Sequence, residues 1–262
     1  MSKLDLPSLL PEVSAIARKA SEVVMRIYQG RPTVSRKADA SPVTEADHAS
    51  EAVILEGLRR LTPDMPIISE EEVEKKGIRF DFERPPQHYW LVDPIDGTKE
   101  FVAKRGEFTI NIGLVEDGKP VLGVLHAPVS GNTYAAVGAG SATVQRGQGP
   151  VERIQVRHPP RSGIVALASR SHGDNEGTSA LLEDHNVAER RLMGSAIKFA
   201  LIAEGVGDLY PRLGPTMEWD TCAGQAILEA AGGSVMTLSG KPLRYGKRGF
   251  LNSDFVARGG AA

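Results

Sequence analysis

Three separated stretches of the sequence place acidic side chains at the ends of apolar runs or at the start of a helix. The acids concerned are Glu70, Asp93, Asp96 and Asp220. Mg²⁺ prefers oxygen ligands and usually takes one or two carboxylates together with water and substrate phosphate. Carboxylates brought together from separate strand ends would repel one another without a cation between them. The pattern therefore indicates a divalent-metal site of the kind that supports phosphoryl hydrolysis.

The stretch from Asp93 to Thr98, with the sequence DPIDGT, has more features than a turn requires. The proline fixes the backbone directly after Asp93, and Gly97 allows the chain to approach a ligand closely. Thr98 adds a hydroxyl group at the same place. Taken by itself, the segment fits a turn and a ligand site equally well.

The other acids also have simpler interpretations. Glu70 and its neighbour Glu71 fit a solvated loop, and Asp220 fits an ordinary helix N-cap, a position at which acidic residues are favoured. It is the combination of all three features that favours a metal site over these alternatives.

Two amphipathic helices are predicted in the first part of the chain. Apolar residues recur at helical spacing over 9–27, and Gly30 follows as a stop signal. A second helix is predicted from Thr44, which can cap it, to Leu61. The polar segment 36–47 is predicted to lie outside the core.

The next part of the chain has the signals of strands. A short buried strand over 66–69 runs directly into Glu70, and a second strand precedes Asp93. Segments 108–115 and 120–126 flank an Asp-Gly turn, which predicts a β-hairpin. The glycine-rich patch 138–149 is predicted to be a hairpin loop.

After about residue 155 the pattern alternates between strands and helices. Strands are predicted over 164–168, 188–193 and 208–211, and helices over 175–185, 195–204 and 221–231. Such alternation indicates an α/β layer. The predicted fold class is α/β (α+β), with helices layered against two sheets in two fused halves. The first half, 1–155, carries most candidate metal ligands, and the second, 156–262, carries Asp220.

Composition excludes several classes of protein. The chain has 262 residues with a formal charge of −2 and no long run of one sign, so no nucleic-acid footprint is present. No apolar run approaches the roughly 18 residues of an integral membrane segment, and the N-terminus is typical of a helix rather than a signal peptide. The single cysteine, Cys222, excludes an internal disulfide and fits a reducing compartment.

Three motifs, in order along the chain, resemble the signature set of the inositol monophosphatase superfamily. They are Ser69-Glu70-Glu71, Asp93-Pro94-Ile95-Asp96-Gly97-Thr98 and Trp219-Asp220-Thr221-Cys222-Ala223-Gly224. Members of this superfamily are Mg²⁺-dependent, lithium-sensitive phosphomonoesterases. The resemblance covers nearly the whole chain, and it implies the layered α/β/α/β/α sandwich of the superfamily.

The resemblance also implies a ligand set for two or three Mg²⁺ ions. The ligands would be the carboxylates of Glu70, Asp93, Asp96 and Asp220 and the carbonyl oxygen of Ile95. Thr98, oriented by Asp47, would position and deprotonate the attacking water together with Glu70. Gly97 and Thr98 would offer backbone N–H groups to the phosphate at an expected helix start.

Within the superfamily, Lys99-Glu100-Phe101 resembles the 3′(2′),5′-bisphosphate nucleotidase branch, because inositol monophosphatases usually carry Thr-Asn in place of Lys-Glu. In that branch the positions of Ser195 and Lys198, beside Gly194, contact the nucleotide. Arg212 is the candidate partner for the other phosphate, and Asp220 also borders the substrate. For the two cations, surface solubility is the alternative role. The sequence Gly194-Ser195-Ala196 departs from the Gly-Ser-Ser of many bacterial members and resembles the inositol type.

The implied reaction is hydrolysis of adenosine 3′,5′-bisphosphate to AMP and phosphate, linked to sulfate assimilation, with 3′-phosphoadenylyl sulfate as a second candidate substrate. Inositol monophosphatase or fructose 1,6-bisphosphatase activity on the same scaffold is the alternative. A binding protein without hydrolytic activity is disfavoured because all the catalytic residue types are present. The expected partner is a small-molecule nucleotide bisphosphate, bound by a monomer or a homodimer. The expected location is the cytoplasm, either free or peripherally attached to the cytoplasmic membrane face.

Overall fold

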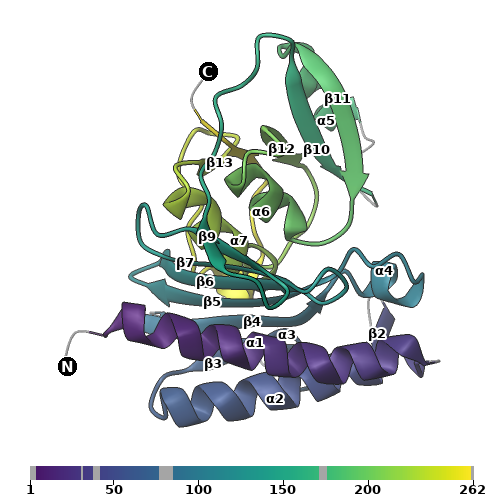
Figure 1. Cartoon of the computed structure of the whole chain (residues 1–262), viewed down its shortest axis with the longest axis vertical. Helices are drawn as coiled ribbons and strands as arrows, with labels where there is room; N and C mark the ends of the chain where they lie inside the picture. Colours follow the sequence, from purple (N-terminus) through teal and green to yellow (C-terminus); the bar gives the residue numbers. More distant parts are fainter. Residues whose placement is uncertain (1–3, 31, 38–41, 77–84, 171–175, 261–262) are drawn as a thin grey trace.

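Helices and sheets alternate in five layers in the computed structural model, which describes residues 4–30, 32–37, 42–76, 85–170 and 176–260 (Figure 1). Helices α1 (Leu6–Gln29) and α2 (Glu45–Leu61) pack on one face of a seven-stranded sheet. Helices α6 (Ile197–Ala203) and α7 (Glu218–Ala230) lie between this sheet and a five-stranded sheet, whose far face is covered by α5 (Glu176–Glu183). The predicted α/β/α/β/α order is confirmed.

The seven-stranded sheet is mostly antiparallel and has the order β3-β4-β5-β6-β7-β8-β9. Its one parallel pair is β3 with β4. The strands are β3 (Ile67–Ser69), β4 (His88–Asp96), β5 (Thr109–Glu116), β6 (Lys119–Ala127), β7 (Asn132–Val137), β8 (Thr143–Arg146) and β9 (Val151–Arg153).

The five-stranded sheet is mixed and has the order β11-β10-β12-β14-β13. Strand β10 pairs in parallel with both β11 and β12, and β14 pairs antiparallel with both β12 and β13. The strands are β10 (Ile164–Ser169), β11 (Val187–Met193), β12 (Leu209–Arg212), β13 (Ser234–Thr237) and β14 (Phe255–Arg258).

Short elements complete the described part of the chain. Strands β1 (Val34–Arg36) and β2 (Pro42–Thr44) form a two-stranded antiparallel pair. The remaining helices are each less than three turns long: α3 (Glu70–Lys76), α4 (Thr98–Val102) and the 3₁₀ turn η1 (Arg248–Phe250).

The two predicted N-terminal helices form for the reasons that their sequences indicate. The apolar stripe of α1 buries Val13, Ala17, Ala20 and Val24, which recur every three or four residues along one face. Thr44 caps α2, and a capping box with Asp47 satisfies the first backbone donors of the helix. Asp47 therefore has a fixed position at the start of α2.

The predicted hairpin is β5 and β6, joined by Asp117 and Gly118, which both have positive φ. Two glycines on this hairpin let α7 lie directly on the sheet. A Cβ atom at Gly113 would lie 2.5 Å from Cys222 Sγ, and one at Gly123 would overlap the carbonyl oxygen of Ala223. Helix α7 therefore holds its first turn, with Asp220, close to the sheet.

Several predictions about local structure were wrong. Val43, Thr44 and Asp47 are buried, so the segment 36–47 is partly in the core, although residues 38–41 lie outside the described residues. The glycine-rich patch 138–149 contains strand β8. Helix α7 begins at Glu218, three residues before the predicted start, because the capping box of Asp220 closes on Met217.

The strands of the large sheet all lie before residue 155, and those of the five-stranded sheet all lie after it. The two sheets share one core cluster, in which Leu125 and Tyr134 from the large sheet meet Phe199 and Phe255. The division into halves 1–155 and 156–262 stays a prediction. The predicted start of a helix at residue 175 lies outside the described residues.

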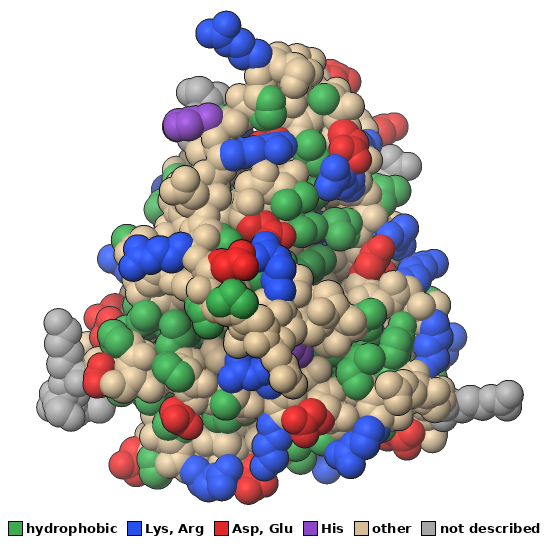
Figure 2. Space-filling view, viewed as in Figure 1, with side chains coloured by type: hydrophobic (Ala, Val, Ile, Leu, Met, Phe, Trp, Pro, Cys, Tyr) green, Lys and Arg blue, Asp and Glu red, His purple; other side chains and the backbone are tan. Residues whose placement is uncertain are grey.

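The surface has a mixed charge pattern. Figure 2 shows basic and acidic side chains interspersed over the face seen there, which agrees with the formal charge of −2. In the described part of the chain, no helix combines the length and apolar character that crossing a membrane requires.

Candidate active site

Carboxylates from three elements line one cavity of about 590 Å³. Glu70 is the first residue of α3, Asp93 and Asp96 end β4, and Asp220 lies in the first turn of α7. Because β3 and β4 are parallel neighbours, the acids that follow each strand leave the sheet at the same edge. The three acidic motifs, up to 150 residues apart in the sequence, thus meet at one place.

Burial and mutual repulsion raise the pKa values of the three aspartates in this cavity. The pKa of Asp93 and that of Asp220 lie well above the ordinary range, because burial disfavours the charged form and because Glu70 and Asp96 lie close by. Burial also raises the pKa of Asp96 to about 6. Buried carboxylates of this kind ionise together only beside cations, and carboxylate oxygens are the ligands that Mg²⁺ prefers. The donor set therefore fits divalent metal ions.

Backbone N–H groups orient two of the aspartates. Asp93 Oδ1 accepts a hydrogen bond from the Ile95 N–H at 3.0 Å, and Asp220 Oδ2 accepts one from the Met217 N–H at 2.8 Å. Each of these bonds uses one carboxylate oxygen, so the direction of the other oxygen is set by the fold rather than by a free rotamer.

Asp96 is held from two sides. Its Oδ2 atom accepts hydrogen bonds from the Ala196 N–H at 2.5 Å and from Asn111 Nδ2 at 3.4 Å. Asn111 is a site residue that the sequence reasoning missed. Its signal was the alternation of polar Thr109 and Asn111 with apolar neighbours in a strand that is buried on both faces.

Thr98 and Asp47 lie together, as the family resemblance implies. Thr98 Oγ1 lies 3.2 Å from Asp47 Oδ1 and 3.1 Å from the Ile95 carbonyl oxygen, and either oxygen can accept its single proton. Burial raises the pKa of Asp47, against the opposing effect of its hydrogen bonds to Thr44. The hydroxyl group thus has a carboxylate within reach as a proton acceptor, while the Ile95 side chain is buried in the core.

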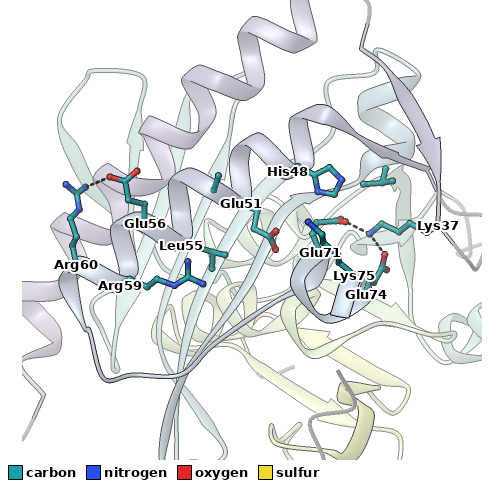
Figure 3. Close-up of a pocket in the computed structure, with 12 residues that line it drawn as sticks. Lys37, His48, Glu51, Leu55, Glu56, Arg59, Arg60, Glu71, Glu74 and Lys75 are labelled. Atoms are coloured by element: carbon teal, nitrogen blue, oxygen red, sulfur yellow. Dashed lines mark hydrogen bonds and ion pairs between the residues drawn. The ribbon is translucent and has the colours of Figure 1, made fainter. Parts of the chain in front are cut away.

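Lys37 is the cation that contacts Glu70, and the sequence reasoning missed it. Its Nζ atom lies 2.7 Å from an oxygen of Glu70 and 2.7 Å from one of Glu71, and it lies 3.1 Å from Glu74 (Figure 3 shows the last two contacts). Burial and Glu70 raise the pKa of Glu71 to about 8 in spite of this pairing. Within the described ranges, no three Asp, Glu, His or Cys side chains already form a metal-binding group.

A larger cavity, of about 1000 Å³, adjoins the site on the side of α2 (Figure 3). It shares Lys37 and Glu74 with the site cavity. Apart from Val43 of β2, the rest of its lining comes from α2 and α3 and includes Glu51. Glu51 Oε1 accepts hydrogen bonds from Ser69 Oγ and the Glu72 N–H, so it fixes the start of α3 that carries Glu70.

The loop after β11 packs against the end of β4. Gly97 has φ +93°, and a Cβ atom there would lie 3.0 Å from the Glu107 carbonyl oxygen and 3.3 Å from Ser195 Cβ. A Cβ atom at Gly194 would lie 2.5 Å from Glu100 Cγ. Both glycines are therefore required by close approach, and they bring Ser195, itself at φ +50°, next to the DPIDGT segment.

Lys198 lies under this loop rather than at the surface, with 2% of its side chain exposed. Its ammonium group donates to the carbonyl oxygens of Met193 at 3.3 Å and Gly194 at 3.0 Å, and also to that of Ser195. Burial lowers its pKa to about 8. Lys198 lines the cavity, but its ammonium group faces the backbone of the loop.

Arg212 ends β12 and lines the same cavity with 8% of its side chain exposed. One guanidinium nitrogen, Nη2, donates to the Pro215 carbonyl oxygen at 2.8 Å. Its Nε atom is buried and has no hydrogen-bond partner within the described residues. A buried donor of this kind costs free energy unless a ligand accepts from it, so Arg212 can accommodate an anionic group.

Comparison with known proteins gives consistent results. A sequence profile of the inositol monophosphatase family matches residues 6–260. The 3′(2′),5′-bisphosphate nucleotidase CysQ of Salmonella typhimurium is 48% identical over 254 residues, covering 94% of this chain and 98% of that protein. The protein of the same name from Escherichia coli K12 is 46% identical with the same coverage.

Solved structures show the same likeness. The crystal structure of CysQ from Bacteroides thetaiotaomicron, a bacterial member of the inositol monophosphatase family, superposes with a TM-score of 0.84 at 36% identity and covers 99% of this chain and 100% of that chain. The inositol monophosphatase from Anabaena gives a TM-score of 0.74 at 26% identity and covers 98% and 92% of the two chains. With its three acidic motifs gathered in one cavity of this fold, the chain belongs to the inositol monophosphatase family.

Proposed function

We propose that the protein is an Mg²⁺-dependent phosphomonoesterase that removes the 3′-phosphate of adenosine 3′,5′-bisphosphate, giving AMP and phosphate. The observation that carries the proposal is the convergence of Glu70, Asp93, Asp96 and Asp220 in one cavity beside the Thr98–Asp47 pair. Family membership supports a metal-dependent phosphatase, and the relatives named 3′(2′),5′-bisphosphate nucleotidase support the substrate. The same chemistry extends to 3′-phosphoadenylyl sulfate and links the enzyme to sulfate assimilation.

The ligands for two or three Mg²⁺ ions are Glu70, Asp93, Asp96, Asp220 and the carbonyl oxygen of Ile95. When bound, the cations supply charge that lowers the pKa of the attacking water and stabilises the leaving 3′-oxygen. The Thr98 hydroxyl, held 3.2 Å from Asp47 Oδ1, orients that water together with Glu70. Asp47 is the acceptor to which the hydroxyl proton can pass, because it is the carboxylate that Thr98 contacts.

The substrate lies along the loop after β11. Gly97 and Thr98 offer backbone N–H groups to the scissile phosphate, and Gly194 and Ser195 face the nucleoside from the neighbouring loop. The unpaired Nε donor of Arg212 binds the phosphate that is not cleaved. The remaining cavity residues in this proposal are Lys198, which adds positive charge beneath the loop, and Asp220, which borders the leaving group.

The substrate is tested by comparing phosphate release from adenosine 3′,5′-bisphosphate, inositol 1-phosphate and fructose 1,6-bisphosphate in the presence of Mg²⁺. We expect the nucleotide to have the highest kcat/KM, because the other two compounds lack the nucleoside that the loop after β11 would contact. A higher kcat/KM for inositol 1-phosphate would refute the nucleotidase assignment and favour the alternative suggested by Gly194-Ser195-Ala196. The absence of phosphate release from all three would refute the phosphatase itself.

Replacing Arg212 with alanine should lower kcat/KM for adenosine 3′,5′-bisphosphate by about 10- to 100-fold, because a hydrogen bond to a charged group contributes about 1.5–3 kcal/mol. The loss for p-nitrophenyl phosphate, which has no second phosphate, should stay below about threefold. Arg60→Ala, at an exposed position of α2, is the matched control. An equal loss of kcat/KM for both substrates would show that Arg212 does not bind the second phosphate.

A further inference from the structure

An ion pair joins the loop before β5 to the end of β10. Glu107 lies between α4 and β5, and Arg170 directly follows β10. Arg170 Nη2 lies 2.6 Å and 2.9 Å from the two carboxylate oxygens of Glu107, and Arg170 Nε lies 3.3 Å from Oε2. About a quarter of the Glu107 side chain and a third of the Arg170 side chain are exposed, so the pair is shielded only in part.

Both partners also hydrogen-bond to the end of β11 or to the loop that follows it. Glu107 Oε2 accepts a hydrogen bond from the Gly194 N–H at 2.9 Å. Arg170 Nη2 donates to the Leu192 carbonyl oxygen at 2.9 Å, and the Arg170 N–H donates to that of Met193 at 3.0 Å. The carboxylate therefore holds Gly194 and the guanidinium holds Leu192, while the backbone N–H of Arg170 holds Met193 between them.

The next two residues of that loop reach the metal-binding acids. Ser195 is in the left-handed region at φ +50°, and the Ala196 N–H donates to Asp96 Oδ2 at 2.5 Å. A non-glycine residue keeps such a conformation only where the surrounding structure enforces it. Glu107 supplies that constraint from one side, and its own carbonyl oxygen packs against both Gly97 and Gly194.

We infer that the Glu107–Arg170 pair is a positioning device for the metal site: it holds residues 192–196 so that the Ala196 N–H orients Asp96 toward the cation. The inference rests on the proposed function, because it takes Asp96 to be a metal ligand. Neither Glu107 nor Arg170 touches the reacting atoms in this role. They act through the loop, as groups behind first ligands commonly do.

The test measures Mg²⁺ binding by the rise in melting temperature during an Mg²⁺ titration, with no substrate present. Removing a group that supports a metal ligand typically lowers metal affinity by about 10- to 100-fold. We expect Glu107→Ala to raise the half-saturating Mg²⁺ concentration about tenfold, with Glu107→Gln, which keeps one acceptor, in between. Glu189→Ala is the matched control, since Glu189 forms an exposed ion pair with Arg191 on β11 and lies outside the segment 192–196.

Arg170→Ala removes the other partner of the pair and should likewise raise the half-saturating Mg²⁺ concentration. This variant replaces Glu107→Ala in the test if Glu107→Ala does not fold. The half-saturating Mg²⁺ concentration of the double variant should be no higher than that of the single variant with the larger effect, because the two residues act as one unit. The inference would be overturned if the half-saturating Mg²⁺ concentration of both single variants equalled that of wild type. An equal rise in Glu189→Ala would also overturn it. If Mg²⁺ does not stabilise even the wild-type protein, then the proposed metal-dependent function fails instead.

Discussion

Replacing Asp96 with asparagine should abolish phosphate release while leaving the protein folded. Asp96 lies among buried carboxylates that raise one another's pKa values, and asparagine keeps its shape while removing its charge. Loss of a metal ligand should cost about 4 kcal/mol or more in the transition state, which is about a 1000-fold loss of kcat/KM. The measurement is steady-state hydrolysis of adenosine 3′,5′-bisphosphate by the purified variant.

The melting temperature without Mg²⁺ should stay at or above that of wild type, because the substitution removes a source of repulsion inside the cluster. The asparagine oxygen can still accept the Ala196 N–H. Asp117→Asn is the matched control, since Asp117 lies in the β5–β6 turn at φ +49°, where asparagine is well tolerated. Activity of Asp96→Asn within about tenfold of wild type would remove Asp96 from the metal site.

Mg²⁺ should stabilise the protein strongly at about pH 8 and weakly at about pH 5, because metal ligands must be deprotonated to bind. At about 100 times its dissociation constant, a ligand adds about 2.7 kcal/mol to the free energy of unfolding. For a chain of this size that corresponds to a rise of about 5–10 °C in melting temperature. The measurement is thermal unfolding with saturating Mg²⁺ or with EDTA across this pH range.

The sign of the pH effect in EDTA follows from the raised pKa values. Asp96 titrates near 6 in the folded protein against an ordinary value of 3.8, so the folded state binds its proton more tightly than the unfolded chain does. The stability contributed by this group is present below 3.8 and is lost as the pH rises through 6. Asp93 and Asp220, whose pKa values are also raised, act in the same direction. An Mg²⁺-induced shift that is the same at both pH values would contradict the buried carboxylate cluster.

Elements with strong local signals were predictable from the sequence. The α1 stripe, the Thr44 cap of α2 and the Asp-Gly turn between β5 and β6 each depend on residues within a few positions of one another. Strands β7, β9, β13 and β14 were not predicted. Strand β14, for example, gains its place between β12 and β13 from pairing with residues 18 to 49 positions away, for which no local pattern is required.

The residues of the candidate site likewise fall into those that the sequence predicted and those that it did not. Its acids were found because they belong to short motifs, and their convergence followed from the family resemblance rather than from spacing. Lys37, Asn111 and Glu107 were not found, because each acquires its role from a partner elsewhere in the chain. Glu107 and Arg170, for instance, are 63 residues apart and look like ordinary surface charges until the fold brings them together.

The contact of α7 with Gly113 and Gly123 determines how far apart the carboxylates of the site lie. Asp93 and Asp96 belong to the sheet, whereas Asp220 belongs to the helix that lies on it. The separation between the two sources of carboxylate is therefore the thickness of one helix-on-sheet contact in which the sheet contributes no side chain at Gly113 and Gly123. Close-packed interior contacts of this kind have low compressibility. The spacing between Asp220 and the two aspartates of β4 is thus set by the packing of the interior, whereas the loop ending at Ala196 sets the orientation of Asp96.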